Sequence, residues 1–284
     1  MLMVTLLATL IGLSLGLLGG GGSILAVPVL AYGAGLPAKE AIATSLIVVG
    51  TTALFALIPH ARRGCVEWRT GGIFSLTAMG GAYLGGLMSE WFSGTTLLLL
   101  FAAMMVVTAL AMFRGRGELE PRMDTPMPVG LVVSEGLAVG AATGLVGAGG
   151  GFLVVPALVL LGGMEMHKAV GTSLMVIALK SLAAFAGHAG HVPIELPLAL
   201  VVAAAAVVGS FVGAAFSERI PAQTLRKVFA CVVLLTAGYV VWREAGPGPA
   251  VTALIIASAI LGWWHWQKVR GPHGRPQPLD SPST

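Results

Sequence analysis

The stretch GLLGGGGSILAVP (residues 16–28) returns 128 positions later as GLVGAGGGFLVVP (residues 144–156), and it decides the fold. The same offset aligns His60 with His188, and the prolines that end both stretches, without a gap. Two unrelated apolar segments would match mainly at Leu, Val and Ala, whereas these matches include Pro and His. The sequence therefore predicts a duplicated unit.

Composition assigns the chain to the membrane. Of its 284 residues 56% are hydrophobic and 10% are charged, against about 25% charged in an ordinary soluble domain. This excludes a separate water-soluble catalytic module. An intramembrane enzyme would need a nucleophile with a base or a metal cluster, and only Glu135 and Lys180 lie deep within the predicted spans, so we predict that the chain is not an enzyme and needs no cofactor. The net charge of +4 comes from basic residues scattered among short loops, which argues against nucleic-acid binding.

Each unit reads as a long apolar helix, a glycine-rich break, a short apolar helix and three further spans. In the first unit (residues 1–113) the predicted helices cover 2–18, 24–35, 41–59, 71–90 and 95–113, and in the second (128–243) they cover 128–146, 152–163, 169–187, 194–216 and 222–242. A cytoplasmic linker at 114–127 joins the units. An additional membrane helix at 250–266 precedes a polar cytoplasmic tail at 267–284.

The short segment at 24–35 decides the predicted topology. A helix of that length rises about 18 Å, too little for a bilayer core about 30 Å thick. We therefore expect each glycine break to form a re-entrant helical hairpin that enters and leaves on one side of the membrane. Three crossings follow in each unit, so the second unit is inverted relative to the first. The predicted fold is an all-α membrane protein of two inverted repeats with one extra C-terminal helix.

The basic residues orient this arrangement. The inverted topology places Lys39 and Arg243 outside and leaves Lys180 within the membrane. The other thirteen basic side chains then lie in the cytoplasm, namely Arg62, Arg63, Arg69, Arg114, Arg116, Arg122, Lys168, Arg219, Arg226, Lys227, Lys268, Arg270 and Arg275. The rival topology of two parallel units gives seven inside and eight outside. Because cytoplasmic loops carry the excess of Lys and Arg, we expect the N-terminus outside and the C-terminus in the cytoplasm.

The glycine breaks are predicted to form the binding site. A break at membrane depth leaves backbone groups without partners, which is tolerated only inside protein or beside a watery cavity. Each break also begins a short helix whose first N–H groups and dipole attract negative charge. Inverted repeats would aim two such N-termini at the midplane, which suits a small anion. The alternative is that the glycines only allow close helix packing.

The candidate substrate-binding residues belong to the two breaks, to the Thr-Ser pair one turn into each following helix, and to a central lysine. They are Gly19, Gly20, Gly21, Gly22, Ser23, Thr44, Ser45, Gly147, Ala148, Gly149, Gly150, Gly151, Thr172, Ser173 and Lys180. Ser23 is also expected to cap the first short helix. The Thr-Ser hydroxyls have an alternative use, a hydrogen bond back to the i−4 carbonyl. No metal site is predicted.

Lys180 and Glu135 are the two charges well inside predicted spans, and the offset pairs them with the uncharged Thr52 and Leu7. A central lysine costs at least about 2.5 kcal/mol and should face a cavity or a partner. Lys180 lies two helical turns from Ser173, on the same face, so one hypothesis is contact with an anionic substrate. The other is an ion pair with Glu135, which is also a candidate carrier of a coupled proton.

His60 and His188 end equivalent spans, and Ala follows each of them. A histidine at a helix C-terminus often interacts with the helix dipole as a cap. The other hypothesis is that the two histidines handle protons or act in gating.

The paired GxxGGGGSxLxxP and GxxGxGGGFLxVP segments are each followed by (A/G)TS-L and then by His-Ala. In these motifs the chain resembles the sulfite exporter TauE/SafE family of bacterial and archaeal membrane proteins, over nearly all of residues 5–243. The resemblance implies export, or sometimes import, of sulfite, sulfonates or related sulfur-containing anions across the cytoplasmic (inner) membrane.

The predicted function is thus secondary transport of a small inorganic or organic sulfur-containing anion across the lipid bilayer. Export by alternating access around the two half-helix N-termini is favoured. A coupled proton is optional, because an inside-negative potential already drives an anion outward. The alternatives are an anion channel and a non-transporting accessory membrane subunit. The sequence leaves the oligomeric state open.

Overall fold

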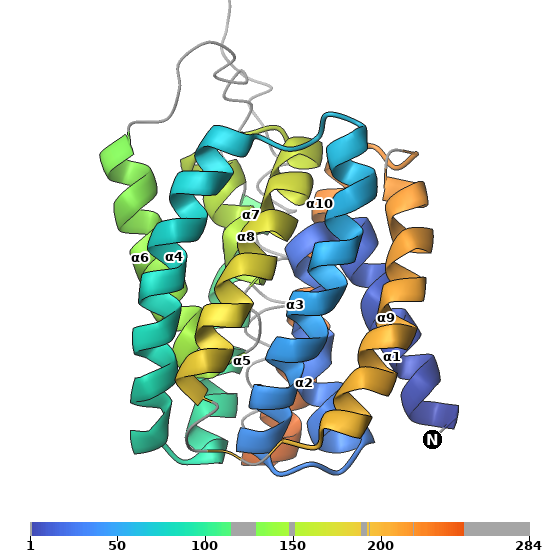
Figure 1. Cartoon of the computed structure of the whole chain (residues 1–284), viewed down its shortest axis with the longest axis vertical. Coiled ribbons are helices and arrows are strands. Elements are labelled where there is room, and N and C mark those ends of the chain that lie inside the picture. The colour runs from blue at the N-terminus through green and yellow to red at the C-terminus, as the bar shows by residue number, and fades with distance from the viewer. Residues whose placement is uncertain are drawn as a thin grey trace, which may run out of the picture.

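The computed structural model describes residues 2–114, 129–147, 151–188, 192, 194–217 and 219–246. Within these residues every regular element is a helix (Figure 1), and seven segments are long and apolar enough to cross a membrane. The prediction of an all-helical membrane protein is confirmed. The predicted helix at 250–266, the tail at 267–284 and all of the 114–127 linker except Arg114 lie outside the described residues.

The first unit contains a short, irregular segment between its first helix and three long ones. Its elements are α1 (Leu2–Leu18), η1 (Gly19–Leu25), α2 (Ala26–Pro28), η2 (Val29–Gly33), α3 (Ala38–Arg62), α4 (Trp68–Met88), η3 (Ser89–Trp91) and α5 (Gly94–Arg114). Helix α4 is not among the seven apolar segments. Six of its 21 residues are glycine, which contribute little hydropathy, but it is as long as its neighbours.

The second unit repeats this order. Its elements are α6 (Val129–Val146), α7 (Gly151–Pro156), η4 (Ala157–Leu161), α8 (Met166–His188), α9 (Leu196–Ser217) and α10 (Ala222–Ala245). The helix α3 extends three residues beyond its predicted span at each end, and α8 begins three residues before its predicted span and ends one residue after it. Helical hydrogen bonding continues past the first charged residue, whereas a hydropathy pattern stops there.

The chain turns back on itself after α1. A side-chain carbon added at Gly22 would collide with Leu15, and one added at Gly33 would lie 3.3 Å from Leu7. The segment from Gly19 to Gly33 therefore runs antiparallel to α1 and packs along it. This path agrees with a helical hairpin in the first unit.

The descending arm of this hairpin is not the plain α-helix expected at 24–35. It starts as a 3₁₀-helix, makes one α-helical turn that ends at Pro28, and continues as a π-helix. In the second unit a π-helix likewise follows Pro156. Proline lacks the N–H for the i→i−4 bond and its ring crowds the preceding turn, so widening to a π-helix accommodates it.

The first helix of each unit packs against a helix of the other unit. Helix α1 packs along α9, with Gly12 against the backbone of Ala206, and α6 packs along α4, with Gly140 against the backbone of Ala78. Adding 128 to Gly12 gives Gly140, and subtracting 128 from Ala206 gives Ala78, so the two contacts are equivalent. A glycine at each crossing lets the two backbones approach closely, so the duplicated sequence produces the same interface twice.

At the centre, α3 and α8 cross in opposite directions. Gly50 lies against Ser181. Leu46, which precedes Gly50, shares a cluster with Ala184, whereas Ala56, which follows it, shares one with Leu174. As residue numbers rise along α3 they fall along α8, so the two helices are antiparallel (Figure 1).

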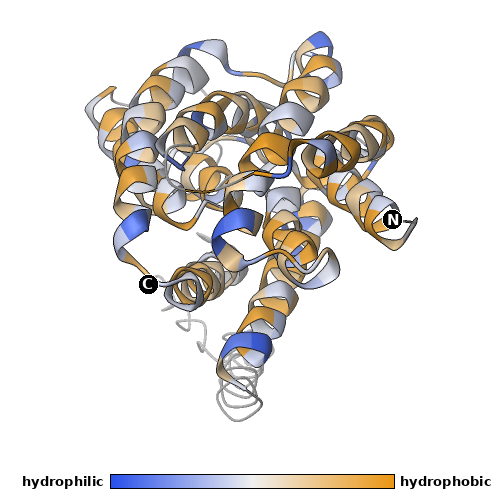
Figure 2. Ribbon diagram, turned by 60° about the horizontal axis from the view of Figure 1, so that its bottom comes forward, coloured by the Kyte–Doolittle hydropathy of each residue, from blue (hydrophilic) through white to orange (hydrophobic). Residues whose placement is uncertain are grey.

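Most residues along the helices are hydrophobic, and the strongly hydrophilic ones lie mainly near helix ends (Figure 2). Large exposed hydrophobic side chains occur on most long helices, among them Leu10, Leu54, Leu76, Val107, Leu137, Leu182, Leu200 and Leu235. A soluble monomer rarely exposes so extended an apolar surface. Lipid is the environment that such a surface requires.

The loops gather at two ends, which we name by their residues. The basic end contains the loops at 63–67, 162–165 and 219–221, which contact one another through the Lys168–Glu67 ion pair at 3.3 Å and a 3.3 Å contact between His167 Nε2 and the Ile220 carbonyl. The Lys39 end contains the loops at 34–37 and 92–93, near the N-terminus of α1 (Figure 1). There Lys39 Nζ donates to the Glu90 carbonyl at 3.2 Å.

Candidate functional site

The two glycine breaks meet each other inside the protein. A methyl group added at Gly20 would collide with the backbone of Gly151, and one added at Gly151 would collide with Gly20. Both glycines are buried. The counterpart of this contact under the 128-residue offset would join Ser23 to Ala148. Ala148, Gly149 and Gly150 are predicted site residues that lie outside the described part of the chain.

Each break turns at an equivalent glycine. Gly19 has φ of +61° and Gly147 has φ of +67°, a left-handed backbone that L side chains rarely adopt. Glycine reaches this region without steric cost. The first glycine of each run is therefore the residue at which the straight helix ends.

A serine from the opposite unit holds each break. Ser45 on α3 donates its hydroxyl to the Gly147 carbonyl at 2.9 Å, and Ser173 on α8 accepts from the Gly20 N–H at 3.3 Å. Both hydroxyls also lie 2.7 Å from their own i−3 carbonyls, so the single Ser45 proton is shared between the Ile42 and Gly147 carbonyls. The back-bonding is therefore to the i−3 and not to the expected i−4 carbonyl, it occurs together with a contact to the break, and direct ligand contact stays a prediction.

The two threonines of the Thr-Ser pairs differ. Thr172 accepts a hydrogen bond from the Glu67 N–H at 2.9 Å, which joins α8 to the loop at the basic end. The Thr44 hydroxyl oxygen is buried without a partner among the described residues. A buried hydroxyl without a hydrogen bond is costly. Of the two threonines, Thr44 is therefore the one available for a further contact.

The predicted capping role of Ser23 is wrong. Ser23 lies inside the η1 3₁₀-helix, and its hydroxyl donates to the Gly20 carbonyl at 2.7 Å. Residue 18 occupies the N-cap position and makes no side-chain capping bond. The capping prediction assumed that the short helix starts after the glycine run, whereas helical structure resumes within it.

Lys180 is buried between α4, α6 and α8, with 1% of its surface exposed. Its Nζ donates to the Thr143 hydroxyl at 3.0 Å. The alternative hypothesis of an ion pair with Glu135 is not met, because both carboxylate oxygens of Glu135 are buried without a hydrogen-bond partner among the described residues. Thr143 lies four residues before the second break, and its own carbonyl accepts from the Gly147 N–H at 2.9 Å. Lys180 is thus anchored one helical turn from that break.

The two histidines lie at opposite ends of the bundle and are equally buried, at 2% exposed. His60 Nε2 lies 3.0 Å from the carbonyl of Gly16, at the end of α1. His188 Nδ1 lies 2.9 Å from the carbonyl of Ala184, in its own helix. His188 contacts a carbonyl in the last turn of its own helix, as the capping hypothesis expects, whereas His60 contacts a carbonyl of α1 and not of its own helix α3. Proton handling or gating stays a prediction.

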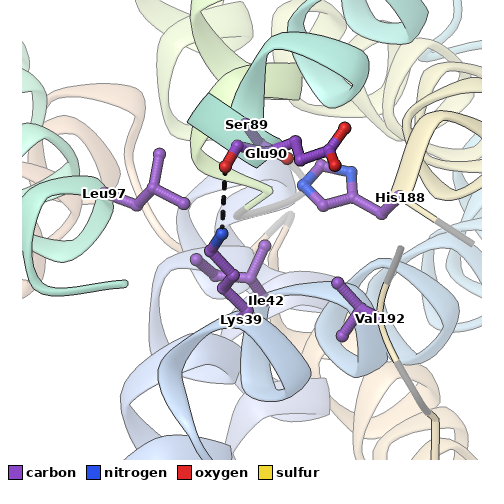
Figure 3. A pocket seen from close by; sticks show the side chains of 7 residues that line it. All are labelled: Lys39, Ile42, Ser89, Glu90, Leu97, His188 and Val192. Atoms are coloured by element: carbon purple, nitrogen blue, oxygen red, sulfur yellow. Dashed lines mark hydrogen bonds between the residues drawn. The ribbon is translucent and has the colours of Figure 1, made fainter. Parts of the chain in front are cut away.

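A cavity of about 270 Å³ opens at the Lys39 end (Figure 3). Its lining consists of Lys39, Ile42, Ser89, Glu90, Leu97, His188 and Val192. Two of these residues also contact the second break, since a methyl group added at Gly147 would collide with Ile42 and lie 3.5 Å from His188 Nε2. The cavity therefore leads from the Lys39 end towards Gly147.

Sequence reasoning missed Lys39, Ser89 and Thr143 as members of the site. A signal existed for Ser89, because Ser89-Glu90 aligns with Ser217-Glu218 at the same offset as the glycine breaks. Nothing in the local sequence marks Thr143, which becomes part of the site only because α6 and α8 both pack along α4 and meet at Thr143 and Lys180.

Comparison with known proteins identifies the family. The Sulfite exporter TauE/SafE family matches residues 4–240. A probable membrane transporter protein of Xylella fastidiosa (strain Temecula1) is 38% identical over 242 residues, which cover 83% of this chain and 92% of the relative. The probable membrane transporter protein YunE of Bacillus subtilis (strain 168) is 29% identical over 245 residues, which cover 77% of this chain and 89% of the relative.

The similarity extends to archaea. A probable membrane transporter protein of Methanocaldococcus jannaschii is 25% identical over 248 residues, which cover 80% of this chain and 91% of the relative. No solved structure is significantly similar to the chain. The family match begins within α1, ends within α10 and spans both glycine breaks, and the chain therefore belongs to the TauE/SafE sulfite exporter family of membrane transporters.

Proposed function

We propose that this protein is a secondary transporter that exports a small sulfur-containing anion, such as sulfite or a sulfonate, across the cytoplasmic membrane of a prokaryote. The observation that carries the proposal is the Lys180 side chain. It is buried inside a membrane protein with a neutral hydroxyl as its recorded hydrogen-bond partner. An ammonium in such a place is costly unless a negative charge joins it, and an anionic substrate supplies that charge.

The position of Lys180 relative to the breaks supports an anion site at their crossing. Its partner Thr143 lies one helical turn before Gly147 and accepts from the Gly147 N–H, and Ile42 and His188, which line the cavity at the Lys39 end, also lie next to Gly147. The site would combine the Lys180 ammonium with main-chain N–H groups of the glycine tracts. Such groups bind oxyanions without needing further charges.

The packing supports two inverted repeats with re-entrant hairpins. Antiparallel crossing of α3 and α8 is what a two-fold axis in the membrane plane requires, whereas parallel units would bring these helices together in the same direction. The basic end carries Arg62, Arg63 and Lys168, so the positive-inside rule assigns it to the cytoplasm. The N-terminus then lies outside.

Alternating access explains how one central site serves both faces. The two units would rock around the crossed breaks so that the site faces each end in turn. Export of an anion gains about 2.3 kcal/mol per charge per 100 mV from an inside-negative potential. A coupled proton, with Glu135 as its carrier, is therefore an addition to the mechanism and not a requirement.

Flux into proteoliposomes tests the proposal. We expect saturable uptake of sulfur-35-labelled sulfite or of a labelled sulfonate, compared with sulfate and thiosulfate as competitors. Lys180→Ala should reduce uptake about 10- to 100-fold, because a hydrogen bond to a charged group contributes about 1.5–3 kcal/mol. Lys168→Ala is the matched control, since Lys168 is half exposed and pairs with Glu67, and it should leave uptake unchanged.

The outcomes separate the alternatives. A folded protein that moves none of these anions contradicts the transporter proposal and favours an accessory subunit. Uptake that rises linearly with concentration favours a channel. Normal flux in Lys180→Ala would remove Lys180 from the site.

A further inference from the structure

The two ends of the bundle contain the same side chains in two different arrangements. At the basic end, the Ser217 hydroxyl donates to the Leu17 carbonyl at 3.0 Å, so α9 is bonded to the end of α1. At the Lys39 end, the equivalent Ser89 donates to the Gly86 carbonyl of its own helix at 2.6 Å. The backbones match, because Gly213 lies against Leu17 as Gly85 lies against Leu145.

The histidines differ in the same way. His60 reaches across to the Gly16 carbonyl of α1, whereas His188 lies against the Ala184 carbonyl of α8, its own helix. Arg63 adds a second link at the basic end, with a 2.7 Å hydrogen bond to the Ala214 carbonyl. At the basic end, these side chains therefore link one helix to another. At the Lys39 end, Ser89 and His188 bond to their own helices and line the 270 Å³ cavity.

One residue difference that bears on the two orientations lies beside the histidines. A side-chain carbon added at Gly86 would lie 3.0 Å from His188 Nδ1, closer than ordinary van der Waals contact. The equivalent residue at the basic end is Ala214, which carries that carbon. If His60 adopted the orientation of His188, its ring would crowd the methyl group of Ala214. This methyl group therefore directs His60 towards α1.

We propose that these are the open and closed forms of one gate that occurs twice, and that the Gly86/Ala214 difference biases the protein towards opening at the Lys39 end. The inference rests on the proposed alternating access. In the opposite state, His188 would bond to the Gly144 carbonyl and Ser89 to the Leu145 carbonyl. His60 and Ser217 would turn back onto α3 and α9.

Cysteine accessibility tests the gate without measuring transport. Leu97 lines the cavity, and its equivalent at the basic end is Leu225. Both side chains are buried, at 1% and 0% exposed, so the contact with the cavity and not surface exposure distinguishes the two positions. In a Cys65→Ser, Cys231→Ser background, Leu97→Cys and Leu225→Cys form a matched pair of reporters. In detergent, where a small anionic methanethiosulfonate reaches both ends, we expect Leu97→Cys to react about tenfold faster or more.

Reciprocal substitutions at positions 214 and 86 should then shift the balance between the open and closed forms. Ala214→Gly should speed labelling of Leu225→Cys about two- to tenfold, the ratio that one neutral hydrogen bond changes. Gly86→Ala should slow labelling of Leu97→Cys by a similar factor. Gly72→Ala on the same helix is the control, since nothing lies within 4 Å of the added carbon, and it should change neither rate.

The result has two readouts. Equal labelling of the two reporters, or an Ala214→Gly protein that folds normally but labels unchanged, overturns the gate. Sulfite flux measured in the same variants addresses the transporter proposal separately. If the reporters respond as expected and no anion moves, the gate stands and the proposed function fails.

Discussion

The duplicated sequence forms equivalent contacts in the interior of the bundle but different contacts at its two ends. In the interior, the contact of Gly12 with Ala206 and that of Gly140 with Ala78 are the same contact made twice. At the ends, equivalent side chains such as His60 and His188 bond to different helices. Backbone crossings with glycine allow one geometry, whereas a side chain at a helix end has several acceptors within reach. Symmetry is therefore kept where packing is closest and lost where a side chain can choose between acceptors.

The largest expected effect tests the symmetric interior. Gly12→Ala and Gly140→Ala each place a methyl group into the backbone of the crossing helix. We expect each to lower the free energy of unfolding by about 3 kcal/mol, the upper range for overpacking, and by equal amounts. Thermal unfolding in detergent measures this, with Gly72→Ala as a control that is neutral or slightly stabilising. A difference between the two variants as large as the loss itself would show that the units do not pack equivalently.

A smaller effect is expected where the units hold each other's breaks. Ser45→Ala removes the 2.9 Å bond to the Gly147 carbonyl, and Ser173→Ala removes the longer 3.3 Å bond from the Gly20 N–H. Losing a buried neutral hydrogen bond costs about 1 kcal/mol, and more where a buried group is left unsatisfied. Ser45→Ala should therefore destabilise more than Ser173→Ala. Chemical denaturation of the purified variants ranks them, and the reverse order would contradict the unequal geometry.

The smallest effect concerns an ion pair found at the basic end. Lys168 and Glu67 are about half exposed, and their equivalents at the Lys39 end are Glu40 and Glu195, which cannot pair in this way. Exposed pairs contribute about 0–1 kcal/mol, so Lys168→Ala should shift the unfolding free energy by about 0.5 kcal/mol or less. Adding salt should produce a similar small loss in the unsubstituted protein. A loss of several kcal/mol would mean that this pair, and not helix packing, ties the basic end together.

Much of the fold could be predicted because its signals are local. Apolar runs located the long helices to within a few residues, and glycine runs located both breaks at Gly19 and Gly147. The prediction failed inside the hairpin, where Pro28 converts the expected α-helix into a π-helix, and at Ser23, which bonds within a 3₁₀-helix instead of capping one. Both failures concern which hydrogen-bond spacing a short helix adopts, a choice that hydropathy does not report.

The amino-acid sequence by itself determined that this is a duplicated helical membrane protein with a glycine break in each half. It could do so because hydrophobic length and glycine content act on neighbouring residues. Only the tertiary structure decided that Gly20 meets Gly151 and that Lys180 contacts Thr143 and not Glu135. Those partners lie on helices far apart in the chain. Their meeting depends on how each helix is rotated about its axis, which is set by packing against its neighbours.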